Sequence, residues 1–164
     1  MKTYKIIIML FSILPLLMAC EPEMYFFDDN YLLEETVKIE LIEYDTDDID
    51  QIKSEDEILP YDFNNETIID TLDINENSDI FQEISNIEFH RTVKYSRTPI
   101  GISLKITYRN GDFAVISSEL IDNINYGGAI LFDSSGSVIE FLGNFATRQQ
   151  FVDLVNRYFD TSID

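Results

Sequence analysis

Cysteine is almost missing from this sequence of 164 residues, and the single one, Cys20, cannot form an intrachain disulfide. A folded domain must therefore be stabilised by its hydrophobic core alone. Histidine also occurs only once, so the nitrogen and sulfur ligands that zinc prefers are too few for a zinc site. Tryptophan is absent, but 12 phenylalanines and nine tyrosines supply enough aromatic side chains for a core.

Basic residues are scarce: 11 Lys and Arg stand against 31 Asp and Glu, which gives a net charge of −20 at pH 7. Proteins bind nucleic acid mainly by neutralising phosphates with Lys and Arg, so we expect no nucleic-acid partner. The same charge keeps the domain soluble. It favours a cationic protein or peptide as partner, because opposite charges steer association.

The N-terminal segment has the most distinct pattern in the chain. Lys2 and Lys5 precede an apolar run over residues 6–17, which is too short to span a membrane comfortably, and the segment ends in LMAC at Cys20. This is the pattern of a secretory signal peptide. It closely resembles the signal peptide of bacterial lipoproteins, whose lipobox reads Leu, a variable residue, a small residue and Cys. The resemblance implies attachment of a diacylglyceryl group to Cys20 and cleavage before it.

Cleavage there removes residues 1–19, which hold two lysines and no acidic residue, and leaves 145 residues with a net charge of −22. A diacylglyceryl group has the two acyl chains that stable anchoring requires. We therefore expect a protein of the cell membrane that faces the extracytoplasmic side. Residues 20–35 would form the tether and residues 36–164 a single domain. The large apolar side chains of the tether leave two interpretations open, a contact with the membrane or a segment that folds back onto the domain.

Most of the mature sequence predicts strands joined by short turns. Apolar and polar residues alternate over 36–44, a short apolar stretch covers 67–72, and a further strand is predicted over about 87–96. Residues 129–142 predict a hairpin that turns near 133–136, with strands that are apolar on both faces. Sequential strands with short turns favour a mainly antiparallel sheet.

Asn110-Gly111 lies between two alternating apolar stretches and predicts another hairpin. This pair favours a two-residue type I′ turn, in which both residues adopt positive φ. Such a turn would place Ile106 opposite Val115, so that apolar side chains meet on one face of the hairpin.

Two segments have the spacing of amphipathic helices that begin at a capping box. Residues 73–76 predict the start of a short helix over about 74–86, and residues 147–150 predict the start of a C-terminal helix. The apolar stripes of the two helices are Ile80, Phe81, Ile84 and Ile87, and Phe151, Leu154, Val155, Tyr158 and Phe159. We therefore expect an α+β fold with a mainly antiparallel sheet, covered on one face by the C-terminal helix and the shorter second helix.

Several short stretches are spread over most of the mature chain: VKIELIEYD (37–45), LPYDFN (59–64), ETIIDTLD (66–73), ITYRNGDFAVI (106–116) and the aromatic helix from Phe151. In these stretches the chain resembles small lipoproteins of low-GC Gram-positive bacteria. That group has no assigned activity to carry over, so the resemblance bears on location and domain extent and not on mechanism.

Residues 45–57 form an acidic loop with one opposing charge, Lys53, and too few apolar residues to pack. We consider this loop a candidate surface for binding a cationic envelope protein or peptide. Its acidic residues are Asp45, Asp47, Asp48, Asp50, Glu55, Asp56 and Glu57. The alternative is a solvated edge without a partner.

Two other function classes are open. Residues 73–84 offer oxygen ligands at the first positions of an EF-hand loop, as in a calcium-binding protein. However, Ser78 replaces the loop glycine and Ile84 replaces the bidentate glutamate, so a capping box fits this segment better. With 31 acids, a carboxylate pair could also serve an envelope hydrolase, which needs two carboxyls with different proton affinities in a deep pocket.

We recognise no catalytic motif in the sequence and predict no metal or cofactor. His90 falls on the solvent side of its predicted strand, and catalysis by an imidazole requires an orienting partner and a reacting group beside it. The main expectation is a non-enzymatic binding module, attached to the membrane through lipid on Cys20.

Overall fold

The computed structural model describes residues 24–25, 35–45, 60–87, 89–90, 101–121, 124–145, 148–161 and 163. The strands are β1 (Met24–Tyr25), β2 (Thr36–Tyr44), β3 (Glu66–Leu72), β4 (Phe89–His90), β5 (Gly101–Tyr108), β6 (Phe113–Ile121), β7 (Ile124–Phe132) and β8 (Val138–Phe145). The helices are α4 (Ile80–Ser85) and α5 (Arg148–Tyr158), and a 3-10 turn, η2, covers Phe63–Asn65.

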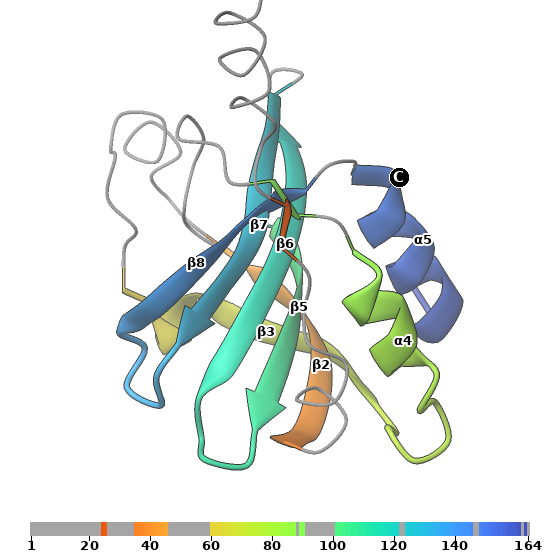
Figure 1. Ribbon diagram of the computed structural model, residues 1–164, viewed down its shortest axis with the longest axis horizontal. Coiled ribbons are helices and arrows are strands. Elements are labelled where there is room, and N and C mark those ends of the chain that lie inside the picture. The colour runs from red at the N-terminus through yellow and green to blue at the C-terminus, as the bar shows by residue number, and fades with distance from the viewer. Residues whose placement is uncertain are drawn as a thin grey trace, which may run out of the picture.

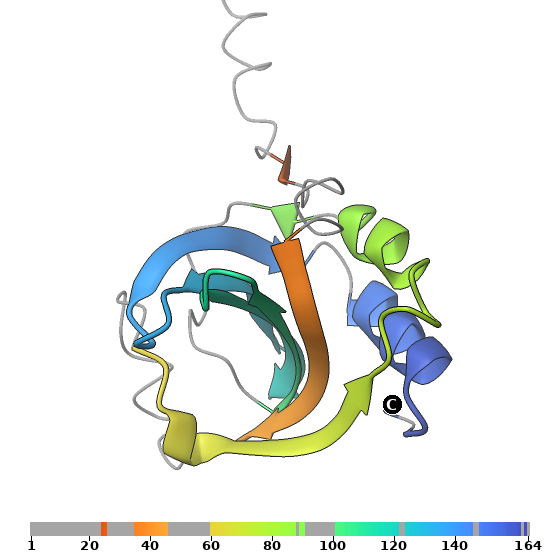
Figure 2. The ribbon, with the colours of Figure 1, turned by 90° about the horizontal axis from the view of Figure 1, so that it is seen from below.

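All eight strands belong to one antiparallel sheet in the order β1-β4-β8-β7-β6-β5-β2-β3. The strands from β5 to β8 follow one another in sequence and in space, because short connections join antiparallel neighbours. The sheet curls strongly, and α4 and α5 lie on its convex side (Figure 1 and Figure 2). The predicted α+β fold, with helices on one face of an antiparallel sheet, is confirmed.

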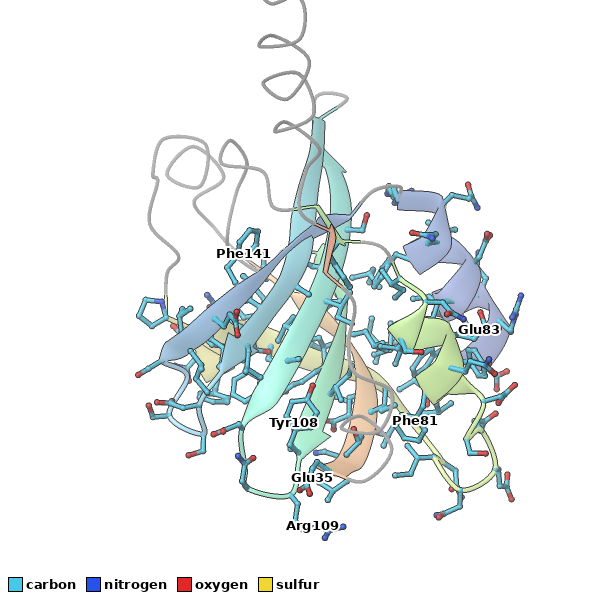
Figure 3. All side chains as sticks on the ribbon, viewed as in Figure 1. Glu35, Phe81, Glu83, Tyr108, Arg109 and Phe141 are labelled. Atoms are coloured by element: carbon cyan, nitrogen blue, oxygen red, sulfur yellow. The ribbon has the colours of Figure 1, made fainter. Side chains whose placement is uncertain are left out.

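The central strands are buried on both faces. On the convex side, Leu104 of β5, Ile84 of α4 and Phe151 of α5 belong to one apolar cluster. Figure 3 shows Phe81 of α4 on this side of the molecule. A second cluster fills the concave side and consists of Ile42, Tyr44, Tyr61, Phe113, Val115, Ile130 and Phe132. Because alternate residues of a strand point to opposite faces, β5 directs Lys105 into the concave side.

The C-terminal helix has the predicted apolar stripe, but the second helix is shorter than predicted. In α5, Phe151 and Val155 are completely buried. The predicted capping residue Thr147 lies outside the described residues. The capping box at 73–76 is wrong, because Asp73 Oδ1 accepts from the N–H of Asn75 at 3.0 Å and forms a local turn. The helix therefore begins only at Ile80.

The β5–β6 hairpin also differs from the prediction, because its loop has three residues instead of two. The Gly111 N–H donates to Tyr108 O at 3.0 Å, and the Tyr108 N–H donates to Asp112 O at 2.9 Å. Asn110 Oδ1 accepts from the Asp112 N–H at 3.0 Å, and Gly111 has φ +92°. These bonds are those of a tight turn followed by one left-handed residue, the next most common hairpin type.

The longer loop shifts the hairpin register by one residue. Ile106 lies opposite Ala114, and Lys105 takes the predicted place of Ile106 opposite Val115. A shift of one residue exchanges the faces that meet across two strands. Lys105 therefore shares the concave face with the apolar side chain of Val115.

At three β-bulges the strand pairing skips an apolar residue whose side chain is exposed. These residues are Val37 in β2, Ile69 in β3 and Ile139 in β8, and they are 50 %, 42 % and 50 % exposed. A bulged residue departs from the alternation of its strand, so its side chain does not enter the core. Val37 therefore breaks the alternation that was predicted over 36–44.

Part of the predicted tether lies in the sheet. Met24 and Tyr25 of β1 pair with His90 and Phe89 of β4, which agrees with the interpretation that this segment folds back onto the domain. Of the strand predicted over 87–96, the residues after His90 lie outside the described ones. Within the described part of the chain, no helix combines the length and apolar character needed to cross a membrane.

Candidate functional site

Lys105 carries a buried cation on the concave face of the sheet. The residue is 8 % exposed, and its Nζ lies 4.8 Å from the ring centre of Phe113, 5.1 Å from that of Tyr61 and 5.2 Å from that of Phe63. It also forms an ion pair with Glu66. A buried ammonium is stable only when it is paired, and aromatic faces add further attraction for a cation.

Tyr61 and Phe63 reach Lys105 from a segment that we call the strap, Pro60–Asn65. The Tyr61 N–H donates to Gly136 O at 2.8 Å, and the Asp62 N–H donates to the Tyr44 hydroxyl at 3.0 Å. Asp62 Oδ1 in turn accepts from the Asn64 N–H at 2.9 Å and stabilises the 3-10 turn. The strap therefore joins the turn of the β7–β8 hairpin to the start of β3, across the open side of the curled sheet (Figure 2).

The Tyr61 hydroxyl completes the buried cluster, because it donates to Glu66 Oε2 at 2.5 Å. Burial raises the pKa of Tyr61 far above its usual value, and the hydrogen bond to Glu66 and the Glu66 charge raise it further. Burial likewise raises the pKa of Tyr44. Both phenols therefore stay neutral at physiological pH, and Tyr61 acts as a hydrogen-bond donor to the carboxylate and not as a base.

A second buried carboxylate, Glu40, lies directly opposite Lys105 on the neighbouring strand β2. It is 3 % exposed and forms an ion pair of 2.9 Å with Lys38, whose side chain is half exposed. The concave face thus holds two carboxylates, the number that a carboxylate-based hydrolase requires. Glu66 is bound to an ammonium and a phenol, and Glu40 is bound to an ammonium.

The residues predicted as sites lie largely outside the described part of the chain. This holds for Cys20 and for the acidic loop, of which only Asp45 is described. Asp45 is exposed at the end of β2, and its N–H donates to Asn65 O at 2.9 Å. The backbone of His90 lies in β4, and its side chain is not described.

The predicted calcium segment, 73–84, forms a turn and the first part of α4. Asp73 uses Oδ1 for the N–H and Nδ2 of Asn75, at 3.0 and 3.3 Å. Its carbonyl oxygen accepts from the N–H of Asn77 at 3.1 Å. Among the described residues, no group of three or more His, Cys, Asp or Glu side chains could hold a metal ion.

The sequence interpretation missed the Lys105 cluster. The prediction placed Lys105 on the face of its strand opposite Ile106, and only the Ile106 face was expected to be apolar. The neighbouring strands have apolar residues on both faces, which indicates that both faces of β5 are buried. The strap sequence PYDFNN contained a usable signal, because it has two aromatic residues, whereas Gly, Pro, Asn, Asp and Ser dominate turns. Comparisons with protein-family models, with curated proteins and with solved structures give no match for this chain.

Proposed function

We propose that this protein is a lipid-anchored extracytoplasmic binding module without enzymatic activity, which associates with a cationic envelope protein or peptide. The lipobox at Cys20 supports the anchor, and the net charge of −22 after cleavage supports the sign of the partner. Anchoring confines the domain to the membrane plane, which raises its effective concentration near an envelope partner.

One observation about the described cations carries this proposal. Lys38, Lys105 and Arg157 each form an ion pair with a glutamate of the same chain: Glu40, Glu66 and Glu83 (Figure 3 labels Glu83 on α4). Three of the five described cations are therefore paired with glutamates, and the described carboxylates outnumber the described cations. An outer surface of this kind attracts cations, whereas the charged groups of the interior are occupied by one another.

Partition and capture experiments test the two halves of the proposal. The full chain should enter the detergent phase, and Cys20→Ser should stay unprocessed or be released, because it cannot carry the thioether-linked lipid. Cross-linking in intact membranes should capture basic partners. Their yield should fall between 0.1 M and 1 M salt, because the screening length shrinks from about 10 Å to about 3 Å. Identical partition of the two proteins would refute the anchor, and a salt-independent yield would refute the electrostatic partner.

A further inference from the structure

β3 is the last strand of the sheet, and among the described residues its only strand neighbour is β2. The outer edge of such a strand presents backbone N–H and C=O groups that can pair with another extended chain. Figure 2 shows β3 at the end of the curl. The strand is thus a place where a partner segment can add to the sheet.

Exposed apolar side chains gather around the start of this strand. Phe63, Ile68 and Ile69 are 47 %, 52 % and 42 % exposed, and only two other large apolar side chains in the described residues are as exposed. Ile68 lies opposite Ile42 on the same side of β3 as Glu66. Phe63 packs against Tyr61 and Phe113, with ring centres 5.1 and 5.6 Å apart.

Negative charge surrounds the same end of the strand. Glu43 is exposed opposite Thr67, and Asp62 is exposed in the strap. The Asp45 N–H donates to Asn65 O at 2.9 Å, which places the exposed Asp45 beside the strap at this end. The ammonium of Lys105, the described cation of this region, is already paired with Glu66. The charge therefore favours an occupant rich in Lys or Arg.

The second half of the strand is protected against pairing. The bulge at Ile69 interrupts the ladder, and Asp70 Oδ1 accepts from the Thr71 N–H at 2.7 Å. Bulges and charged side chains are the devices by which edge strands avoid association with one another. A second copy of this chain is disfavoured further by its own negative charge. The open part of the edge is therefore Glu66–Ile68.

We propose that the edge of β3 at Glu66–Ile68 docks an extended cationic segment of the partner, which adds to the sheet as a short strand. Backbone hydrogen bonds to the edge would hold the segment, its apolar side chains would contact Phe63 and Ile68, and its Lys or Arg residues would face the surrounding carboxylates. This inference rests on the proposed binding function and assigns it a place on the fold.

The test uses the full chain in detergent and a fluorescent peptide of about eight residues in which Lys and Val alternate. Binding should saturate and should weaken as salt rises. A peptide of the same sequence with methylated backbone nitrogens keeps the charge but cannot donate to the edge, so it should bind at least about tenfold more weakly. Equal binding of the two peptides would overturn the proposal, because charge alone would then explain it.

A pair of variants locates the site. Ile68→Lys should reduce affinity for the Lys-Val peptide at least about tenfold, whereas Ile139→Lys, the same change at a side chain of equal exposure on β8, should reduce it less than about threefold. Equal losses would overturn the assignment to β3. If thermal unfolding shows that Ile68→Lys is not folded, Phe63→Lys, at the other apolar side chain of the proposed contact, replaces it.

The failure of this inference and the failure of the proposed function are distinguishable. If membrane cross-linking captures a salt-sensitive partner that Ile68→Lys retains in full, the β3 edge is refuted and the binding module stands. If no salt-sensitive partner is captured, the proposed function is refuted, whatever the peptide does.

Discussion

The buried ion pair between Lys105 and Glu66 is the feature at the residue scale that most shapes the concave face. Removing one partner of a buried pair leaves an uncompensated charge, which is far costlier than losing an exposed pair. The side chains of both residues are 10 % exposed, whereas those of the Arg157 and Glu83 pair are 57 % and 40 % exposed. The two pairs therefore provide a direct internal comparison.

Lys105→Met should lower the free energy of unfolding by about 3 kcal/mol, because it leaves the Glu66 carboxylate buried without a cation. Arg157→Met, the matched change in the exposed pair, should cost less than about 1 kcal/mol. Urea unfolding of both variants measures the difference, and Lys105→Met with Glu66→Gln should recover part of the loss. Similar losses in the two single variants would show that the concave pair is not buried in solution.

The sequence could not predict the β6 residue opposite Lys105, because that pairing depended on one turn. Asn110-Gly111 fits both a two-residue and a three-residue loop, and the hydrogen bond from the Asp112 N–H to Asn110 Oδ1 belongs to the longer one. Alternation within β5 was predicted correctly, because Leu104, Ile106 and Tyr108 belong to the convex cluster and Lys105 lies against Phe113 on the concave side. The β6 residues that pair with β5 were predicted wrongly. Apolar residues lie on both faces of β6, so the registers of a two-residue and of a three-residue loop are both plausible.

At the scale of elements, turns and strands determine which of these residues meet. Amphipathic patterns with a single buried face were predictable, as the stripe of α5 shows. The extent of α4 was not, because Asp73 bonds to its own turn in competition with a helix start. The strap was not predicted either, since its position depends on Gly136, which is distant in sequence. Contacts between segments far apart in the chain leave no periodic signal.

Gly136 should tolerate substitution less well than Gly111, although both have positive φ, +88° and +92°. A Cβ at position 136 would lie 2.6 Å from the carbonyl oxygen of Tyr61, whereas at position 111 the nearest atom is Ser134 Cβ at 3.3 Å. Gly111→Ala should cost about 1 kcal/mol for the backbone alone. Gly136→Ala should cost clearly more, because it also displaces the strap. Equal urea midpoints for the two variants would contradict the contact between the strap and the hairpin.

The β7–β8 turn should make the protein less stable in acid. Hydrogen bonds from the Ser135 hydroxyl at 2.6 Å and from the N–H groups of Ser137 and Ser135 at 2.9 and 2.8 Å lower the pKa of Asp133. A lowered pKa in the fold gives stability that is fully present above the unfolded value of about 3.9 and is lost as pH falls through the folded value.

The stability difference between the wild type and Asp133→Asn should therefore be largest near neutral pH and shrink as pH falls below about 4. Ser135→Ala should reduce this pH dependence, since the hydrogen bond from the Ser135 hydroxyl contributes most to the lowered pKa of Asp133. Urea midpoints measured across this range test the prediction. A difference that stays constant with pH would show that the carboxylate charge does not stabilise the turn.

At the scale of the whole molecule, the proposed function depends on the net charge and on the expected lipid attachment. The net charge follows from composition, and the proposed lipid attachment rests on one short contiguous motif, so both could be proposed from the sequence alone. The curled sheet could be predicted only as an antiparallel sheet, because its curvature depends on bulges such as that at Ile69 and on the strap. The proposed docking place depends on the strand order, which leaves β3 as an edge.

Association with a cationic partner should be steered by the acidic surface at this scale. Asp47, Asp48 and Asp50 lie in the stretch that the sequence predicts to be a solvated acidic loop, so neutralising them together to Asn should change stability little. The triple variant should bind a captured partner more slowly and with a weaker dependence on salt. Its thermal unfolding serves as the control for an intact fold.

The most direct measurement of the central claim is the association rate of the captured partner with the membrane-anchored protein between 0.1 M and 1 M salt. The wild-type rate should fall steeply as the screening length shrinks from about 10 Å to about 3 Å, and the rate of the Asp47, Asp48 and Asp50 triple variant should fall less. Equal rates for the two proteins, unchanged by salt, would contradict an electrostatic binding module.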